Sequence, residues 1–266
     1  MLRMQKIKLI ACDLDGTLLL NGAQTLRETT CDLIKALYDR GILFIAASGR
    51  QYTNLQRLFE PVKDKIGYLC ENGCIGFYQG KRLFKERLDR TLGQEIMKTI
   101  MDTEGAEVLL SGEMVSYLQP NDPRFVSHMR DVVRNDVVVV PDILETQEEY
   151  MKISVYEENG IKHKELWEKR FGSRCTVVTG GNDWLDIMPL HINKATGLRQ
   201  ILSYLSISPE DCMAIGDNDN DMEMLKLVGV PVAVKSAKPE IREIARIETE
   251  TVEELFQRLL EEQPDS

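Results

Sequence analysis

The chain has 266 residues, of which 43% are hydrophobic and 29% charged, and its formal net charge at pH 7 is −10. This composition is typical of a folded globular protein and excludes disorder over most of the length. The acidic balance argues against a nucleic-acid partner or an anionic membrane surface, because both are bound by basic patches. No apolar run approaches the roughly 18 residues that a membrane-spanning helix needs. Residues 1–6 show no apolar core of a secretion signal, so we expect a cytoplasmic protein.

The first predicted element is a buried strand that ends at two carboxylates. An apolar run covers residues 7–12, Asp13 and Asp15 follow it, and Gly16 then allows a sharp turn. In open α/β sheets ligands bind at the carboxyl ends of the strands, so we expect both aspartates at the edge of a crevice. Two carboxylates this close repel each other unless a cation lies between them or one keeps its proton. Both arrangements suit phosphoryl transfer.

The next elements predict a parallel sheet. After a helical pattern, a second buried strand covers residues 42–47 and ends at Ser48 and Gly49. A strand, helix, strand unit is almost always a right-handed parallel crossover, so Ser48 should lie at the same sheet edge as Asp13. A hydroxyl beside a backbone amide can hold a phosphoryl oxygen, although Ser48 could equally cap the following helix. A third strand over residues 66–70 continues the sheet.

The middle of the chain has a different pattern. A predicted hairpin over residues 77–84 is followed by short strands mixed with helices, which indicates an α+β unit rather than more parallel sheet. We therefore expect a separate α+β domain inserted over residues 77–188. Residues 1–76 and 189–266 would form the core, an α/β fold with a doubly wound, Rossmann-like parallel sheet.

The pattern of the first segment resumes after the insertion. A helix begins near Lys194, and a buried strand over residues 213–215 precedes the acidic cluster Asp217–Asp221. This cluster is not a calcium loop of the EF-hand type, because Met222 and Val228 stand where that loop needs glycine and glutamate. By itself the cluster could be a solvated acidic turn. Together with the first pair of aspartates, a shared metal ion explains it better.

Charge counting adds a cation to the predicted site. Four carboxylates of the two clusters would contribute to the site, those of Asp13, Asp15, Asp217 and Asp221. A magnesium ion offsets only two of these charges, so a site that accepts a phosphate dianion still needs a cation from the protein. Lys194 could supply it, although a lysine at a helix start more often faces solvent.

Four motifs in chain order carry a resemblance to a known family. The motifs are Asp13–Thr17, Ser48–Arg50, Lys194 and Gly216–Asp221. They resemble the motifs of the haloacid-dehalogenase-like hydrolase superfamily. The long insertion between the second and third motifs is similar to that of the Cof-type branch, which hydrolyses phosphorylated metabolites. The resemblance implies that the inserted α+β domain, residues 77–188, is a cap that closes over the site and selects the substrate.

The resemblance implies a role for each motif residue. Asp13 would be the nucleophile that forms an aspartyl-phosphate, and Asp15 the general acid and base. The ion would be Mg²⁺, held by the Asp13 carboxylate, the Asp15 carbonyl oxygen and Asp217, with Asp221 supporting them. The residues that would bind the phosphate are Leu14, Ser48, Gly49, Lys194 and Asn220. Because Asp15 must be protonated for the first step, we expect it to be buried among carboxylates.

The expected activity is therefore that of a magnesium-dependent phosphatase that acts on a small phosphorylated metabolite. Sugar phosphates and cofactor phosphates such as pyridoxal phosphate or flavin mononucleotide remain open as substrates. The alternative is a catalytically idle protein of the same fold that binds or regulates, but no motif residue is missing to indicate this. We expect a monomer or a weak homo-oligomer.

Overall fold

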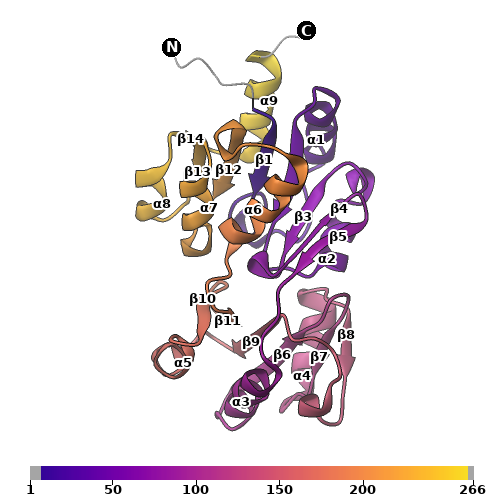
Figure 1. Cartoon of the computed structure of the whole chain (residues 1–266), viewed down its shortest axis with the longest axis vertical. Helices are drawn as coiled ribbons and strands as arrows, with labels where there is room; N and C mark the ends of the chain where they lie inside the picture. Colours follow the sequence, from indigo (N-terminus) through magenta and orange to yellow (C-terminus); the bar gives the residue numbers. More distant parts are fainter. Residues whose placement is uncertain (1–6, 263–266) are drawn as a thin grey trace.

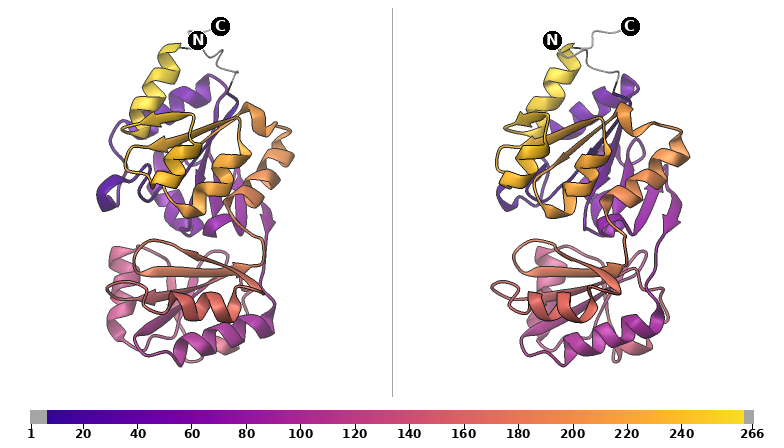
Figure 2. Two further views of the ribbon diagram at one scale, coloured as in Figure 1. Left: turned by 90° about the vertical axis from the view of Figure 1, so that its left-hand side faces the viewer. Right: turned by 60° about the vertical axis from the view of Figure 1, so that its left-hand side comes forward.

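The chain folds into two bodies, each built on its own β-sheet (Figure 1; Figure 2). The structure is a computed structural model that describes residues 7–262. Residues 1–6, on which the expectation about a secretion signal rests, lie outside the described part. Within residues 7–262, no helix combines the length and the apolar character needed to cross a bilayer.

The first sheet has a parallel centre and an antiparallel edge. Its strand order is β14-β13-β12-β1-β2-β3-β4-β5, and the first six strands of this order are parallel neighbours. The parallel strands are β1 (Leu9–Cys12), β2 (Leu43–Ala47), β3 (Gly67–Cys70), β12 (Cys212–Gly216), β13 (Val230–Val234) and β14 (Ile247–Thr249). All four residues of β1 are buried, because helices cover both faces of the sheet, and this explains its continuous apolar sequence.

Helices lie on both faces of the first sheet. The chain runs from β1 to β2 in one direction along the sheet and from β12 to β13 in the other. Because such crossovers are right-handed, the reversal puts their helices on opposite faces. Accordingly α1 packs against α9, whereas α7 packs against α6 and α8. The helices are α1 (Thr30–Asp39), α2 (Tyr52–Leu58), α6 (Lys194–Leu205), α7 (Met222–Leu227), α8 (Pro239–Ile244) and α9 (Val252–Glu262). The doubly wound parallel core predicted from the sequence is confirmed.

The predicted hairpin belongs to the first sheet. We expected it at the start of the inserted segment, from residue 77, but β4 (Ile75–Tyr78) pairs antiparallel with β3, and β5 (Lys81–Lys85) pairs with β4. An aromatic contact fixes this placement, since the ring of Phe77 stacks on that of Tyr52 with centroids 3.7 Å apart. The hairpin therefore extends the edge of the parallel sheet.

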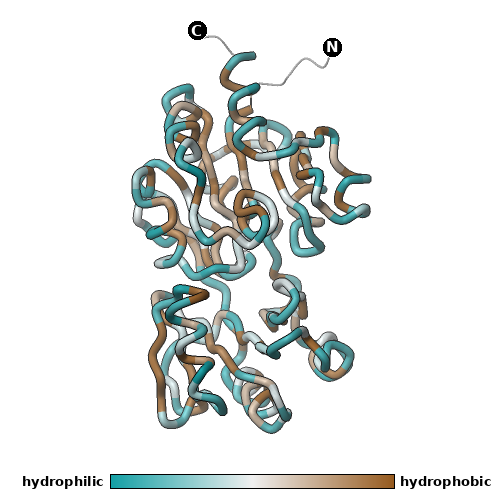
Figure 3. The backbone as a smooth tube through the Cα atoms, turned by 180° about the vertical axis from the view of Figure 1, so that it is seen from behind, coloured by the Kyte–Doolittle hydropathy of each residue, from teal (hydrophilic) through white to brown (hydrophobic). Residues whose placement is uncertain are grey.

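The second sheet is mainly antiparallel and has the order β10-β11-β9-β6-β7-β8. Its strands are β6 (Ala106–Ser111), β7 (Ser116–Leu118), β8 (Val137–Val139), β9 (Lys152–Glu157), β10 (Cys175–Thr179) and β11 (Trp184–Pro189). The helices of this body are α3 (Arg90–Met101), α4 (Pro123–Ser127) and α5 (Lys164–Phe171). Side chains of α3 and α5, including Ile96, Ile100 and Trp167, form a core with one face of the sheet. Figure 3 shows the hydrophobic segments that run through both bodies.

The other face of the second sheet carries buried polar groups. Strand register places Ser154 of β9 beside Leu109 of β6 and Asp186 of β11. Lys152 lies two residues along β9, so it shares this face with Ser154. Lys152, Ser154 and Asp186 are each at least 96% buried. Buried polar side chains need partners, and Lys152 and Asp186 find some of theirs in the first body, at Glu71, Gly49 and Asn72.

Candidate active site

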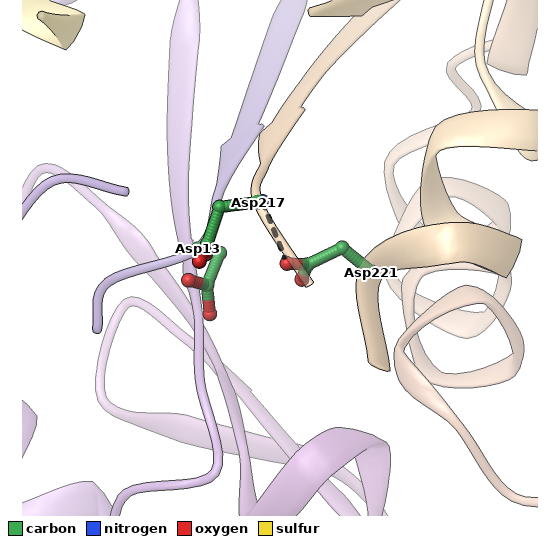
Figure 4. A group of neighbouring side chains, drawn as sticks. All are labelled: Asp13, Asp217 and Asp221. Atoms are coloured by element: carbon green, nitrogen blue, oxygen red, sulfur yellow. Dashed lines mark hydrogen bonds between the residues drawn. The ribbon is translucent and has the colours of Figure 1, made fainter. Parts of the chain in front are cut away.

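The site lies where the strand order of the first sheet reverses. β1 and β12 are parallel neighbours, and β1 leads to Asp13 as β12 leads to Asp217. Ligands of open α/β sheets bind at such a switch point. Carboxylate oxygens of Asp13, Asp217 and Asp221 lie within 4.8 Å of one another (Figure 4). Asp13 and Asp221 are buried, and Asp217 is half-buried.

Lys194 is the cation of this cluster. It is the first residue of α6, which begins with a capping box in which the Asn193 side chain accepts from the Thr196 N–H and Thr196 Oγ1 accepts from the Asn193 N–H, each at 3.0 Å. The Lys194 ammonium donates to Asp13 and, at 2.7 Å, to Asp221. Burial alone lowers the pKa of Lys194, but these two carboxylates outweigh it and raise the pKa. The lysine is therefore charged and faces the acidic cluster rather than solvent.

Asp221 acts as a support for its neighbours. Its Oδ1 accepts from Lys194, and its Oδ2 accepts the backbone N–H of Asp217 at 3.1 Å and of Asn218 at 3.2 Å. Figure 4 shows the bond to the Asp217 backbone. Asp217 in turn accepts from the Thr17 hydroxyl at 2.8 Å. Both oxygens of Asp221 are thus occupied by the chain, which fits the supporting role expected for it.

The donor set fits a magnesium ion. The cluster holds three carboxylates and the single ammonium of Lys194, which contacts two of them, so two negative charges stay uncompensated when all three are ionised. Burial is the main cause that raises the pKa of both Asp13 and Asp217, and the charge of Asp221 raises both further. Oxygen ligands with an excess of negative charge are what Mg²⁺ prefers. Asp13 and Asp217 are the side chains that would hold it.

Asp15 is not where the sequence analysis expected it. Its side chain is 54% exposed, and it forms a two-pronged ion pair with Arg50, Nε to Oδ2 at 2.9 Å and Nη2 to Oδ1 at 2.6 Å. The expectation that Asp15 is buried among carboxylates is therefore wrong. The residue lies past the end of β1, and the turn at Gly16 directs its side chain to the loop after β2. Arg50 is a site residue that the sequence analysis named without a role.

Most of the expected phosphate ligands meet at one cavity of about 360 Å³ between the two bodies. Asp13, Asp15, Ser48, Gly49 and Asn220 line it, whereas Lys194 reaches it only through Asp13. The Leu14 side chain is buried, so only its backbone can contribute.

The second sheet supplies polar groups that the sequence analysis missed. The ammonium of Lys152 lies 2.8 Å from Glu71, 3.1 Å from Asp186 and 2.8 Å from the Gly49 carbonyl oxygen. The Asn72 amide donates to Asp186 at 2.6 Å and accepts from Asn220 at 3.2 Å. Alternation of polar and apolar residues over 152–157 was the available signal, because it gives one strand face to lysine and serine.

The far wall of the cavity is apolar and aromatic. Trp184, His128 and Leu109 line it. The rings of Trp184 and His128 both pack on Tyr156, with centroids 4.9 Å away in each case. The second body therefore contributes both these apolar and aromatic side chains and the polar groups around Lys152 to the cavity.

Comparison with known proteins identifies the family. The profile of the haloacid dehalogenase-like hydrolases matches residues 10–255. The 5-amino-6-(5-phospho-D-ribitylamino)uracil phosphatase of Escherichia coli is 25% identical over 233 residues, which are 87% of this chain and 86% of the relative. The HMP-PP phosphatase of Cronobacter sakazakii is 25% identical in an alignment of 245 positions that covers 88% of this chain and 86% of that one. A haloacid dehalogenase-like hydrolase from B. subtilis shares the fold, with a TM-score of 0.83 at 21% identity over 95% of this chain and 100% of its own. The chain therefore belongs to the haloacid dehalogenase-like hydrolase family.

Proposed function

We propose that the protein is a magnesium-dependent phosphatase of small phosphorylated metabolites that works through an aspartyl-phosphate on Asp13. The observation that carries the proposal is the position of Asp13, which lines the cavity while its carboxylate is held by Lys194 and lies beside Asp217. A buried carboxylate with a fixed orientation and a free face is suited to nucleophilic attack. The relatives named above are phosphatases, which supports the same reaction class.

The chain's own residues suggest how the reaction proceeds. Mg²⁺, when bound, would offset the negative charge shared by nucleophile and phosphate. An oxygen of Asp13 attacks phosphorus and the ester P–O bond breaks. Asp15, which must first leave Arg50 and take up a proton, gives that proton to the leaving oxygen. Asp15 then takes a proton from the water that attacks the aspartyl-phosphate, which releases phosphate and restores Asp13. Lys194 keeps Asp13 oriented throughout.

Arg50 bears on the proposed role of Asp15. Its guanidinium holds both carboxylate oxygens of Asp15 and also donates to Asn54 at 3.3 Å. A forked contact of this kind fixes the plane of the carboxylate. Asp15 lines the cavity in this arrangement, so Arg50 keeps it near the position of the leaving group.

The second body would act as the cap that closes the site and selects the substrate. It contributes the apolar wall of the cavity, and Asn54 of α2 donates to the carbonyl oxygens of Val133 and Arg134 across the junction. Closing such a cap excludes water from the reacting groups. Sugar phosphates, pyridoxal phosphate and flavin mononucleotide are the substrates to compare first.

The test is phosphate release from a panel of these compounds, with Mg²⁺ or with chelator, by the wild type and Asp13→Asn. We expect release only from the wild type with Mg²⁺. Beryllium fluoride, which mimics a phosphoryl group on a carboxylate, provides a binding assay in parallel. If the wild type neither releases phosphate nor binds beryllium fluoride, the catalytic proposal fails and a binding or regulatory protein of this fold becomes the better explanation.

A further inference from the structure

A buried ion cluster joins β9 of the second body to the loop after β2, Ser48–Arg50, which we call the phosphate loop because Ser48 and Gly49 are expected phosphate ligands. Lys152 of β9 is 96% buried, and its ammonium contacts the carboxylates of Glu71 and Asp186. Burial alone lowers the pKa of Lys152, but the two carboxylates outweigh it and raise the pKa, so the lysine is charged. Ion pairs this deep require well-placed partners to offset the loss of water. The third contact of this ammonium is not a carboxylate but the Gly49 carbonyl oxygen, at 2.8 Å.

The contact to Gly49 continues to Ser48 through one peptide group. The carbonyl of Gly49 and the N–H of Arg50 belong to the same trans peptide, so they point in opposite directions. Lys152 donates to the carbonyl on one side, and the Arg50 N–H donates to Ser48 Oγ at 3.1 Å on the other. A charged donor on the carbonyl polarises the peptide and strengthens its N–H as a donor.

This chain of hydrogen bonds decides what the Ser48 hydroxyl can do. A hydroxyl has one O–H to donate and lone pairs to accept. Because Ser48 Oγ accepts from Arg50, its own O–H is directed elsewhere, and Ser48 lines the cavity together with Asp13. Phosphate oxygens only accept, so a serine poised to donate is the useful orientation.

We propose that Lys152 is a positioning residue that acts across the two bodies, through the Gly49–Arg50 peptide, to orient the Ser48 hydroxyl toward the transferring phosphoryl group. The inference rests on the proposed phosphatase function. If Lys152 has this role, the phosphate loop is complete only when the second body is docked on the first, because Lys152 comes from β9. Closure of the cap and assembly of the phosphate site are then one event.

The competing explanation is that Lys152 merely holds the two bodies together. Lys85 of β5 provides the matched control, because it too is largely buried and bridges the bodies. Its ammonium lies 3.2 to 3.3 Å from three carboxylates of the second body, those of Glu113, Glu148 and Glu149. Lys85 does not line the cavity and does not contact Gly49. Lys85→Met therefore removes a bridge without touching the phosphate loop.

The experiment is a double-mutant cycle on hydrolysis of p-nitrophenyl phosphate in saturating Mg²⁺. We expect Lys152→Met to lower kcat by about tenfold with little change in KM, because the interaction matters most when charge develops on the phosphoryl oxygens. In a Ser48→Ala background the same substitution should cost less than about twofold, since its target is absent. Lys85→Met should leave kcat within about twofold in both backgrounds.

Two further measurements keep the test decisive. Lys152→Met leaves the carboxylates of Glu71 and Asp186 without a counter-charge. The cycle is therefore repeated in a Glu71→Gln background, which has one buried charge fewer. There the double variant Lys152→Met with Glu71→Gln is compared with Glu71→Gln alone. The ¹⁹F spectrum of beryllium fluoride bound in Mg²⁺ gives a readout that does not depend on turnover. Lys152→Met should shift the fluorine resonance that Ser48→Ala also shifts, whereas Lys85→Met should not.

The outcomes separate the two proposals. If the wild type neither turns over p-nitrophenyl phosphate nor binds beryllium fluoride, the phosphatase function fails, and the role of Lys152 falls with it. If the wild type does either and Lys152→Met matches it, only the role of Lys152 is overturned. An equal loss of kcat with and without Ser48 also overturns it, because the lysine then acts as a clamp between the bodies.

Discussion

Asp13 lies in surroundings that disfavour its own charge. Burial is the largest cause that raises its pKa, Asp221 adds to it, and the ammonium of Lys194 offsets only part of the two. A carboxylate that attacks phosphorus must be ionised, so the cluster needs more positive charge than the chain supplies. At the scale of single residues, this is the reason to propose Mg²⁺ at Asp13 and Asp217.

Gly16 controls the position of Asp217. Its φ is +94°, and a Cβ there would lie 2.9 Å from Cγ of Asp217. Gly16→Ala should therefore push this carboxylate away and weaken Mg²⁺ binding by about tenfold or more, measured by calorimetric titration. Gly41→Ala is the control, because Gly41 has a φ of +78° and nothing within 4 Å of the added Cβ. Both variants carry the backbone cost of about 1–2 kcal/mol. Equal Mg²⁺ affinity in the two would remove Asp217 from the metal site.

Asp13 and Asp15 show how far the sequence predicts single residues. Asp13 directly follows a buried strand, so its place at the sheet edge was predictable from the apolar run alone. Asp15 lies beyond that strand, and its direction depends on a partner 35 residues away, the Arg50 guanidinium. Repulsion between the neighbouring carboxylates did not predict the surroundings of Asp15, because an ion pair with Arg50 offsets its charge instead.

Helix α6 carries a prediction at the scale of elements. Its capping box fixes the first turn and therefore the backbone of Lys194. Asn193→Ala should lower the free energy of unfolding by about 1 kcal/mol and should also reduce kcat by about threefold to tenfold, because Lys194 shifts against Asp13.

Asp89→Ala is the matched control for this cap. Asp89 caps α3 by accepting from the Leu92 N–H at 2.9 Å, and this helix lies in the second body. Asp89→Ala should lower the free energy of unfolding, measured with denaturant, by about as much as Asn193→Ala does, but it should leave kcat unchanged. A kcat for Asn193→Ala that equals that of Asp89→Ala would mean that the cap stabilises α6 without orienting Lys194.

Strands were predictable from the sequence where one or both of their faces are buried under helices of the same body. The apolar runs of β1, β2 and β12 predicted buried strands, and the helical spacing of apolar residues after them predicted the helices that connect parallel strands. The three-residue strand β14, Ile247–Thr249, was not predicted, because three residues are too few to show a strand pattern. The sheet to which the β4–β5 hairpin belongs was also beyond the sequence, because it depends on the contact of Phe77 with Tyr52.

Mg²⁺ should stabilise the whole molecule if it binds between β1 and β12. A ligand at about 100 times its Kd raises the free energy of unfolding by about 2.7 kcal/mol, which thermal unfolding with Mg²⁺ or chelator would detect. Asp217→Asn should abolish the effect. Asp219→Asn should keep it, because the Asp219 side chain is 62% exposed and pairs with Lys238 at 2.7 Å. An unchanged melting temperature in Mg²⁺ for the wild type would contradict the site.

We propose that the two bodies divide the cavity between reaction and selection, and this proposal predicts which substrates suit the cavity. The first body supplies the Asp13 carboxylate and the Ser48 hydroxyl, whereas the second supplies the aromatic side chains of Trp184 and His128. Offset ring contacts contribute about 0.5–1.5 kcal/mol beyond burial, and a sugar ring lacks them. We therefore expect pyridoxal phosphate to be hydrolysed with a higher kcat/KM than a hexose phosphate.

Replacing the wall residue tests this division directly. Trp184→Leu keeps an apolar side chain but removes the ring, so kcat/KM for pyridoxal phosphate should fall by about threefold to tenfold while that for a hexose phosphate changes less than about twofold. Phe171→Leu is the control, because Phe171 is buried in the core of the second body and does not line the cavity. If Trp184→Leu lowered kcat/KM equally for both substrates, the Trp184 ring would serve only the packing of the second body. Substrate selection would then have to come from the polar groups around Lys152 and Asp186.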